Sequence, residues 1–211
     1  AKEVIHITAY SAVLMNTWNK KVIYSKNPHV KLAPASTTKI MTALVVLKKS
    51  ELNKNVNVSR GATRMPPSKV DIKKGEIYST EDMLKAALLN SGNDASVALS
   101  ESVAGTEKAF VKMMNDMARK IGCRNTNFKT SNGLPAKGQY STAYDLALIM
   151  REAVKDKRLL NILQIKETEI IELTSGRRIK LRNHNKSLWK NASYLMLGKT
   201  GYTIRAKQCF L

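Results

Sequence analysis

The chain has 211 residues, of which 43% are hydrophobic and 25% charged, and it carries a formal net charge of +20. This length can bury a sizeable core, and the composition is that of an ordinary globular protein, which excludes an intrinsically disordered chain. The longest apolar runs, such as residues 43–47, are too short to cross a bilayer. The sequence has no Met start and no signal peptide, so a processed or trimmed product is expected, which leaves secretion open.

The positive charge lies at both ends of the chain. Residues 1–60 contain 10 basic and 2 acidic side chains, and residues 181–211 contain 6 basic and none acidic. Such a field favours anionic surroundings, such as nucleic acid, anionic lipid or the acidic polymers of a cell wall. A solvated basic surface without a specific partner is the alternative. Aromatic residues make up only 6% and form no repeat with the basic ones, which disfavours nucleic-acid binding.

Cysteines and histidines predict neither a metal site nor a redox motif. Cys123 and Cys209 belong to no C-x-x-C pair, and the three histidines are scattered. We expect two buried free thiols rather than a disulfide.

In the N-terminal part of the chain, strand-like runs precede a helix. Residues 11–15 and 21–24 alternate in the manner of two strands joined by a polar turn. Pro34 ends a loop, and Ser36 begins a helix with apolar residues at inward positions. Residues 50–75 are predicted to form short strands and loops.

The middle of the chain predicts successive helices with recognisable caps. Ser79 and Asp82 resemble a capping box for a helix over residues 80–89, and another helix is expected over 95–103. Thr106 begins a Met-rich amphipathic helix that Gly122 closes, and its methionines are expected to fill the core. A second capping box is expected at residues 142–145, at the start of a helix that ends near residue 154.

The C-terminal segments return to strand character from residue 167 onward. We therefore predict an α+β fold in which N- and C-terminal strands share one antiparallel sheet beside a central helical cluster. The whole chain, residues 1–211, is expected to be one domain. Its sheet lobe would comprise residues 1–35 and 165–211, and its helical lobe residues 36–164.

The first candidate site is Ser36-x-x-Lys39. Residues three apart lie on one face of a helix, so the hydroxyl and the ammonium can come within hydrogen-bonding reach. The first helical turn and partial burial both disfavour the lysine charge, which lowers its pKa and suits it to accept a proton from serine. Ordinary helix capping by Ser36 is the alternative for this motif alone.

Two further polar clusters follow. Ser91-Gly92-Asn93 places a hydroxyl and an amide in a turn between two helices. Lys199-Thr200-Gly201 lies in a strand-like segment, where glycine lets a substrate backbone approach closely. A phosphate-binding loop is rejected because its first glycine would have to stand at position 193 and a helix would have to follow.

The three clusters occur in the order S-x-x-K, S-x-N and K-T-G, with 55 residues from Ser36 to Ser91 and 108 from Ser91 to Lys199. Together with "PASTTKIMTAL", "LLNSGNDASVALSE", "NGLPAKGQYSTAYDLALIM" and "LGKTGYT", they give a sequence that resembles the D-alanyl-D-alanine carboxypeptidases among the low-molecular-mass penicillin-binding proteins. Gly92, and the lack of a Glu-x-x-x-Asn element between residues 132 and 198, favour this family over class A β-lactamases.

The resemblance implies a β-lactamase/transpeptidase-like fold and a serine acyl-enzyme mechanism. Ser36 would attack the penultimate D-Ala carbonyl of a peptidoglycan stem peptide, and Lys39 would accept its proton. Ser91, together with Lys199, would pass a proton to the departing D-Ala. β-Lactams would acylate Ser36 and leave slowly, and no metal or organic cofactor would be needed.

The remaining residues of the motifs would bind the substrate. Asn93 would hold a substrate amide, Thr200 would lie near the terminal carboxylate, and Gly201 would allow close approach of the peptide. The backbone N–H groups of Ser36 and Tyr202 would form the oxyanion hole. Action outside the cytoplasm is implied, with no nucleic-acid partner.

In the family, the K-T-G strand is followed by more strands, a helix and often a second β domain with a membrane-associating helix. Here the sequence ends at Leu211, so we expect C-terminal strands to be missing, together with a basic residue that helps to bind the substrate carboxylate. Membrane association would depend on that absent region. Such an open sheet edge is an aggregation hazard.

Two other functions compete with the carboxypeptidase hypothesis. One is a β-lactamase-like hydrolase on the same scaffold, and the other is a non-enzymatic protein that binds polyanions through its basic charge.

Overall fold

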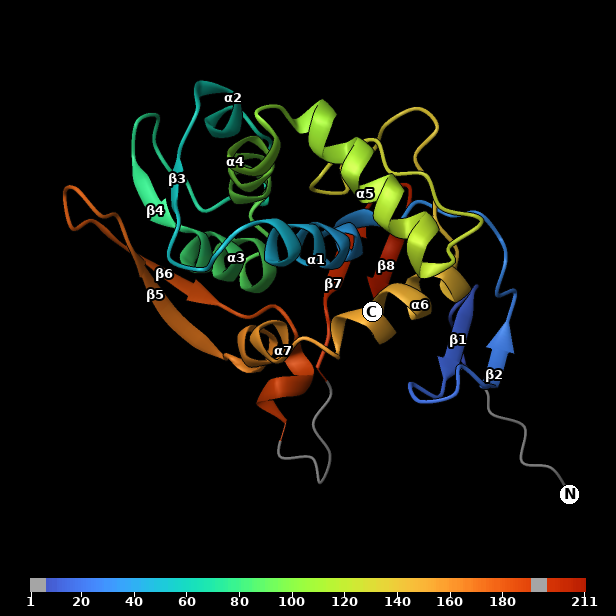
Figure 1. The fold of residues 1–211 in the computed structure, drawn as a ribbon. Coiled ribbons are helices and arrows are strands. Elements are labelled where there is room, and N and C mark those ends of the chain that lie inside the picture. Colours follow the sequence, from blue (N-terminus) through green and yellow to red (C-terminus); the bar gives the residue numbers. More distant parts are fainter. Residues whose placement is uncertain (1–6, 191–196) are drawn as a thin grey trace, which may run out of the picture.

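The computed structural model describes residues 7–190 and 197–211, and Figure 1 shows their arrangement. Helices occupy the middle of the chain and short strands occur on either side of them and between them. In chain order the elements are β1 (Ala12–Met15), β2 (Val22–Lys26), the 3-10 helix η1 (Ala35–Thr37), α1 (Thr38–Lys49), β3 (Asn55–Asn57), α2 (Arg60–Thr63), β4 (Ile77–Ser79), α3 (Thr80–Leu89), α4 (Asn93–Ala104), α5 (Glu107–Ile121), α6 (Ala143–Ala153), α7 (Lys157–Gln164), β5 (Glu167–Ile171), β6 (Arg178–Arg182), the 3-10 helix η2 (Lys186–Trp189), β7 (Thr200–Thr203) and β8 (Lys207–Phe210).

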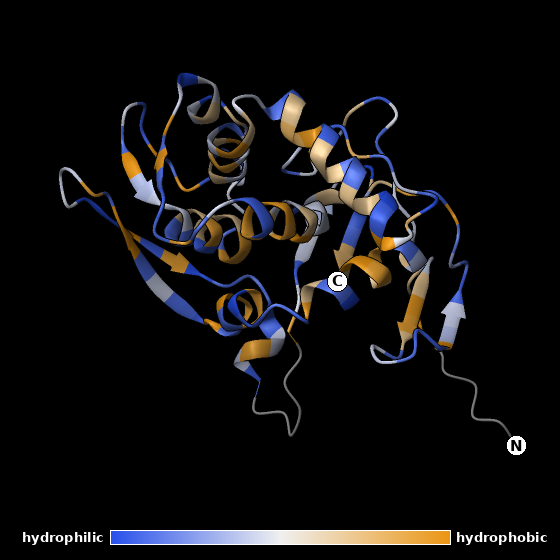
Figure 2. Cartoon of the chain, viewed as in Figure 1, coloured by the Kyte–Doolittle hydropathy of each residue, from blue (hydrophilic) through white to orange (hydrophobic). Residues whose placement is uncertain are grey.

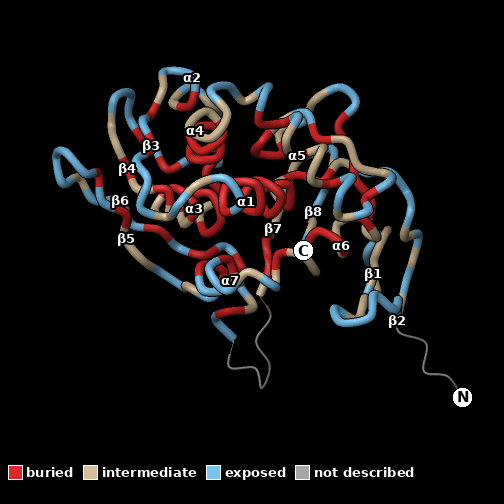
Figure 3. The backbone as a smooth tube through the Cα atoms, viewed as in Figure 1, coloured by how far each residue is buried: buried red, intermediate tan, exposed pale blue. Residues whose placement is uncertain are grey.

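Helix α1 forms the centre of the core. Every residue from Thr38 to Leu47 is buried, and Figure 3 shows this helix as buried along most of its length. Helices α3, α4, α5 and α6 pack around it. Hydrophobic residues are concentrated on these central helices, whereas the loops are mostly hydrophilic (Figure 2). A polar side chain that α1 directs inward is therefore removed from water, which makes its charge costly.

The predicted helix caps are confirmed in their first half. The hydroxyls of Ser79, Thr106 and Thr142 each accept a hydrogen bond from the backbone N–H three residues further on. Gly122 ends α5 with a positive φ of 100°.

A capping box also needs a second contact, from the acidic side chain back to the backbone N–H of the N-cap residue. For both predicted capping boxes this second contact is wrong. The carboxylate of Asp82 pairs with Lys85 and also accepts from the backbone of Ile171. The carboxylate of Asp145 accepts from the backbone N–H of Asn125 and the hydroxyl of Thr126. Tertiary partners therefore occupy both carboxylates in place of the local contact.

The α+β class is confirmed, but the common sheet of N- and C-terminal strands is not found among the described residues. The described strands form four separate antiparallel pairs: β1–β2, β3–β4, β5–β6 and β7–β8. Each hairpin satisfies its inner backbone groups locally, and Lys199 and Leu211 extend the last pair by exchanging both backbone hydrogen bonds. Residues of the first and last hairpins line one wide hollow and do not pair with each other.

Other expectations are met in part. Helices α2, α7 and η2 form in segments where the sequence predicts no helix. Met114 is fully buried, and Met113 and Met117 pack against the core from half-buried positions, as expected for core filling.

Both cysteines are free, but only Cys123 is buried while Cys209 is half-buried, so the prediction of two buried thiols is wrong for Cys209. The division into a sheet lobe and a helical lobe stays a prediction.

No helix among the described residues is long and apolar enough to cross a membrane.

Candidate active site

A hollow of about 1550 Å³ brings the three sequence motifs together. It is lined by Ser36 from η1, by Ser91 and Asn93 at the start of α4, and by Thr200 and Gly201 of β7. The motifs are distant in sequence, and their convergence follows from the packing of α4 on α1 and of β7 on η1.

Ser36 and Lys39 form the contact that the i, i+3 spacing predicts. Lys39 Nζ lies 3.0 Å from Ser36 Oγ and donates to it. Lys39 is fully buried, whereas Ser36 is half-buried and faces the hollow. The hydroxyl is therefore accessible from the hollow while its lysine neighbour is not.

Two more oxygens surround the Lys39 ammonium. Its Nζ donates to Asn93 Oδ1 at 2.8 Å and to the backbone carbonyl of Asn132 at 2.7 Å. An ammonium has three donors, so all three are used when Lys39 is charged. When Lys39 is neutral, its two remaining donors match the two amide oxygens, and its lone pair can accept the Ser36 proton.

The electrostatic environment favours the neutral form of Lys39. Burial lowers the pKa of Lys39 well below its ordinary value of 10.5, the positive charge of Lys199 lowers it further, and Asp94 acts in the opposite direction. Burial also lowers the pKa of Lys199 to about 7. Two buried lysines are therefore held near the same hollow with weakened affinity for their protons.

Backbone conformation near the serines is unusual. Ala35, directly before Ser36, has a φ of 47°, and Ser91 has a φ of 61°. Both lie in the left-handed region that non-glycine residues rarely adopt, and such strain clusters at functional sites.

Gly201 explains how β7 approaches the candidate nucleophile. A Cβ atom at this position would lie 2.9 Å from the Ser36 backbone nitrogen and 3.2 Å from that of Thr37. Only glycine therefore lets the strand pass this close to the amide of Ser36.

Some motif residues are placed differently from the expectation. Both polar groups of Asn93 have partners, since its Nδ2 donates to the Pro66 carbonyl while its Oδ1 accepts from Lys39. Lys199 Nζ donates to the backbone carbonyl of Thr200 at 2.7 Å. Among the described residues no hydrogen bond joins the Ser91 hydroxyl to either lysine. Tyr202 lines the hollow with its side chain largely exposed.

Sequence reasoning interpreted Asn132 only as part of a turn, yet its carbonyl contacts Lys39. The segment is held by Glu107, whose Oε1 accepts from both the backbone N–H and the hydroxyl of Ser131, at 2.8 and 2.7 Å. Gly133 follows with a φ of 87°, and a Cβ there would collide with the Ala35 carbonyl at 1.8 Å. Gly133 in "SNGLP" was the sequence signal that could have indicated this contact, because only glycine lets the segment approach the backbone of Ala35 so closely.

Asp94 is a second residue that the motifs did not identify. Fully buried beside Asn93, it accepts from the backbone N–H groups of Val70 and Ile72, at 3.0 and 3.4 Å. This contact fixes the inner side of the loop over residues 66–76, part of which lines the hollow.

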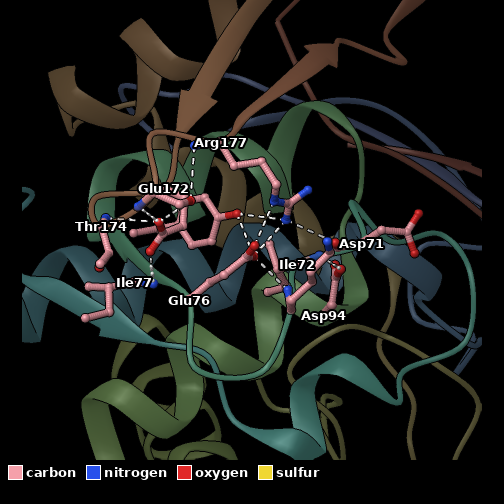
Figure 4. Close-up of polar contacts among 11 residues, drawn as sticks. Asp71, Ile72, Glu76, Ile77, Asp94, Glu172, Thr174 and Arg177 are labelled. Carbon is pink, nitrogen blue, oxygen red and sulfur yellow. Dashed lines mark hydrogen bonds and ion pairs between the residues drawn. The ribbon is translucent and has the colours of Figure 1, made fainter.

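The outer side of the same loop is held by Arg177, between β5 and β6 (Figure 4). Its guanidinium forms two hydrogen bonds of 2.7 Å with the Glu76 carboxylate and donates to the Asp71 carbonyl at 3.3 Å. Tyr78 donates its hydroxyl proton to Glu76 as well. The β5–β6 hairpin thus supports one wall of the hollow from outside.

Solved structures with the same architecture are penicillin-binding proteins and DD-peptidases. A D-alanyl-D-alanine carboxypeptidase from Mycobacterium tuberculosis superposes with a TM-score of 0.89 at 29% identity, over 96% of this chain and 76% of that chain. A mutant Streptomyces DD-transpeptidase gives a TM-score of 0.90 at 28% identity, over 98% and 85%. The fold and the clustered motifs therefore define a protein of the penicillin-binding class.

Curated relatives narrow this class. DacF of Bacillus subtilis, a D-alanyl-D-alanine carboxypeptidase, is 39% identical over 206 residues, which are 95% of this chain and 52% of that protein. DacC of Escherichia coli, of the same description, is 37% identical over 95% of this chain and 52% of its own length. The chain thus spans about half the length of these relatives. It belongs to the D-alanyl-D-alanine carboxypeptidase family, which matches residues 1–211.

Proposed function

We propose that this chain carries the catalytic machinery of a serine-type D-Ala-D-Ala carboxypeptidase, which removes the terminal D-Ala from peptidoglycan stem peptides and is inhibited by β-lactams. The observation that carries the proposal is the buried Lys39 Nζ, which lies 3.0 Å from Ser36 Oγ and also contacts the oxygens of Asn93 and Asn132. The family and the names of the relatives support the substrate class.

Lys39 is the proposed general base. Its lowered pKa favours the neutral amine, and the oxygens of Asn93 and Asn132 orient its lone pair toward Ser36. Proton transfer from Ser36 to this amine leaves a nucleophilic oxygen at the edge of the hollow.

Acylation then exchanges one bond for another. The bond from Ser36 Oγ to the penultimate D-Ala carbonyl carbon forms, the C–N bond to the last D-Ala breaks, and a proton passes to the departing amine through Ser91 and Lys199. The Ser36 and Tyr202 amides are the proposed oxyanion hole, a contribution of about 3 kcal/mol per donor in comparable sites. Water hydrolyses the ester and regenerates Ser36.

Substrate positioning is assigned to the remaining motif residues. Thr200 is proposed to bind near the substrate carboxylate, with Gly201 giving room for the peptide. Among the described residues, one donor and one lone pair of the Asn93 amide have no partner, so Asn93 can position Lys39 and also hold a substrate amide. The proposal needs no cofactor and places the reaction outside the cytoplasm.

A labelled penicillin tests the proposal on the intact folded chain. We expect a covalent mass increase that disappears in Ser36→Ala and persists in Ser187→Ala, a change at another serine that lines the hollow. The same preparation should release D-Ala from a peptide that ends in D-Ala-D-Ala.

Two results would contradict this function. A mass increase that survives Ser36→Ala would exclude Ser36 as the nucleophile, and the absence of any increase in the unmodified chain would exclude acylation altogether. Rapid turnover of nitrocefin without a lasting adduct would instead support the β-lactamase-like alternative.

A further inference from the structure

A second hollow, of about 1070 Å³, lies at the opposite end of α1 from Ser36. It is formed by the last turns of α1, α5 and α6, the start of α7 and the turn between β1 and β2, elements that can be followed in Figure 1. We call it the basic groove because of the basic side chains that line it: Lys20, Lys48, Lys49, Lys120, Arg151, Lys155, Lys157 and Arg158.

The acidic residues of the basic groove do not neutralise this charge. The groove has three of them, and each already has a local partner: Asp116 pairs with Arg119, Glu152 with Lys155, and Asp156 with Arg158. None of the ion pairs formed among the described residues involves the remaining five lysines, all of which are exposed: Lys20, Lys48, Lys49, Lys120 and Lys157.

Helix dipoles explain only part of this arrangement. Lys48, Lys49 and Lys120 lie in the last turns of their helices, where a positive charge is favourable. Lys157 is the first residue of α7, where the dipole disfavours a cation, and Lys20 comes from a hairpin turn. The convergence of these charges on one concave surface therefore calls for an anionic partner.

Arg151 connects the basic groove to the turn between β1 and β2. One of its terminal nitrogens donates to the Trp18 carbonyl at 3.2 Å, while its Nε is buried without a hydrogen-bond partner among the described residues.

We propose that the basic groove binds a linear polyol-phosphate polymer, a chain in which phosphodiesters alternate with short aliphatic segments. The exposed lysines supply positive charge for its phosphates, and the side chains of Met113, Met117 and Ile121 in the lining offer apolar surface to the carbon atoms between them. The concave shape suits a chain better than a flat surface.

Two other polyanions fit less well. Single-stranded nucleic acid binds through aromatic stacking platforms, and no Phe, Tyr or Trp of the described residues lines the groove. An anionic bilayer is expected to bind a surface with several exposed apolar side chains. None of the large hydrophobic residues that are exposed among the described residues belongs to the groove lining, although Trp18 lies beside it, with its carbonyl bonded to Arg151.

The groove is separate from the candidate catalytic site. Lys39 and Lys49 stand ten residues apart on α1, a separation of about 15 Å along the helix axis at ~1.5 Å per residue. Binding there would retain the protein on a polymer while Ser36 stays accessible, so the proposal does not depend on the reaction at Ser36.

The test compares two triple variants of equal charge. Lys48→Gln/Lys49→Gln/Lys120→Gln removes three groove lysines, and Lys54→Gln/Lys112→Gln/Lys180→Gln removes three exposed lysines elsewhere. Affinity for poly(glycerol phosphate) is measured over a range of salt concentrations, and thermal unfolding confirms that both variants fold. The groove variant should bind about 10- to 100-fold more weakly at low salt, and the control within about twofold of the unmodified chain.

Further arms separate the sources of negative charge. Inorganic phosphate at matched phosphate concentration should compete weakly, because it lacks linked charges. Single-stranded DNA and vesicles that contain phosphatidylglycerol should bind no differently to the two triple variants. Equal losses of polymer binding in both variants, or no loss in either, would overturn the proposal. A groove-dependent loss seen only with DNA or only with vesicles would assign the groove to that partner and overturn it as well.

Discussion

At one end of α1, Lys39 is fully buried and donates to three oxygens, whereas at the other end Lys48 and Lys49 are exposed and form no ion pair among the described residues. These lysines share one helix and differ in their surroundings. Burial lowers the pKa of Lys39 and so favours its neutral form, while exposure leaves the others free to attract a partner over a longer range.

The difference shows that the residue type does not determine the chemistry. The helix supplies the same side chain at both ends, and its packing decides between proton transfer and charge attraction. A lysine is kept inside the core only where acceptors compensate for its removal from water, and Asn93 and Asn132 provide them.

The largest expected effect comes from removing the buried lysine. Lys39→Met should lower the rate of acylation by a labelled penicillin by about 1000-fold, because general bases contribute in that range. The matched change Lys48→Met should alter the rate by less than about twofold, since an exposed surface substitution away from the site has little effect. Stopped-flow measurement on both variants, with thermal unfolding as the folding control, checks this. A similar loss in both would remove the distinction between the two ends.

Gly201→Ala should follow, with a loss of about 10- to 100-fold, because displacing reacting groups by about 1 Å costs that much. The added methyl group would stand 2.9 Å from the Ser36 backbone nitrogen and displace either β7 or η1. The acylation rate and the melting temperature are measured together. A normal acylation rate would show that Ser36 does not need the close approach of β7 in order to react.

Sequence reasoning succeeded where contacts are local. The caps at Ser79 and Thr106 and the Ser36–Lys39 pair follow from spacings of three residues. It failed where partners are distant, because no local pattern encodes them. The Asn132 carbonyl lies 93 residues from Lys39 in the chain, and a backbone oxygen has no residue type to signal its role.

The sheet arrangement shows the same limit. Each strand pair that the structure contains is a hairpin between successive strands or, for β3–β4, a pair separated only by α2 and a loop. A sheet shared by both chain ends was inferred from strand character alone, and alternation does not specify the partner. The convergence of the three motifs was predicted only by the family resemblance, since spacings of 55 and 108 residues carry no geometry by themselves.

The pH dependence of stability should distinguish buried from exposed lysines. Lys199 has a pKa lowered to about 7 in the folded state, so between pH 7 and about 10.4 the unfolded chain binds more protons than the folded one. The free energy of unfolding should therefore rise with pH in this window, by up to about 1.4 kcal/mol per pH unit from this group.

Denaturant unfolding at pH 7, 8 and 9 measures that slope. Lys199→Met should reduce this slope to the part that Lys39 contributes. Lys49→Met should leave the slope unchanged. An equal slope in Lys199→Met and the unmodified chain would show that burial does not lower the pKa of Lys199.

The smallest expected effect concerns the support behind Lys39. Glu107 accepts from the backbone and the hydroxyl of Ser131, and this places the next carbonyl, that of Asn132, against Lys39. Glu107→Gln retains the side-chain shape and one carbonyl oxygen but replaces charge-assisted hydrogen bonds with weaker neutral ones. We expect acylation to slow by about 3- to 10-fold, corresponding to roughly 1 kcal/mol.

A purely structural role for Glu107 predicts something else, and the pH profile separates the two. If Glu107 acts by positioning an acceptor of the Lys39 ammonium, weakening that contact disfavours the charged lysine, so the acidic limb of the acylation profile should move to lower pH. Asp116→Asn, on the same helix but paired with Arg119 at the surface, is the control and should move neither the rate nor the limb. Loss of stability in Glu107→Gln with an unmoved acidic limb would show that the Asn132 carbonyl does not tune Lys39.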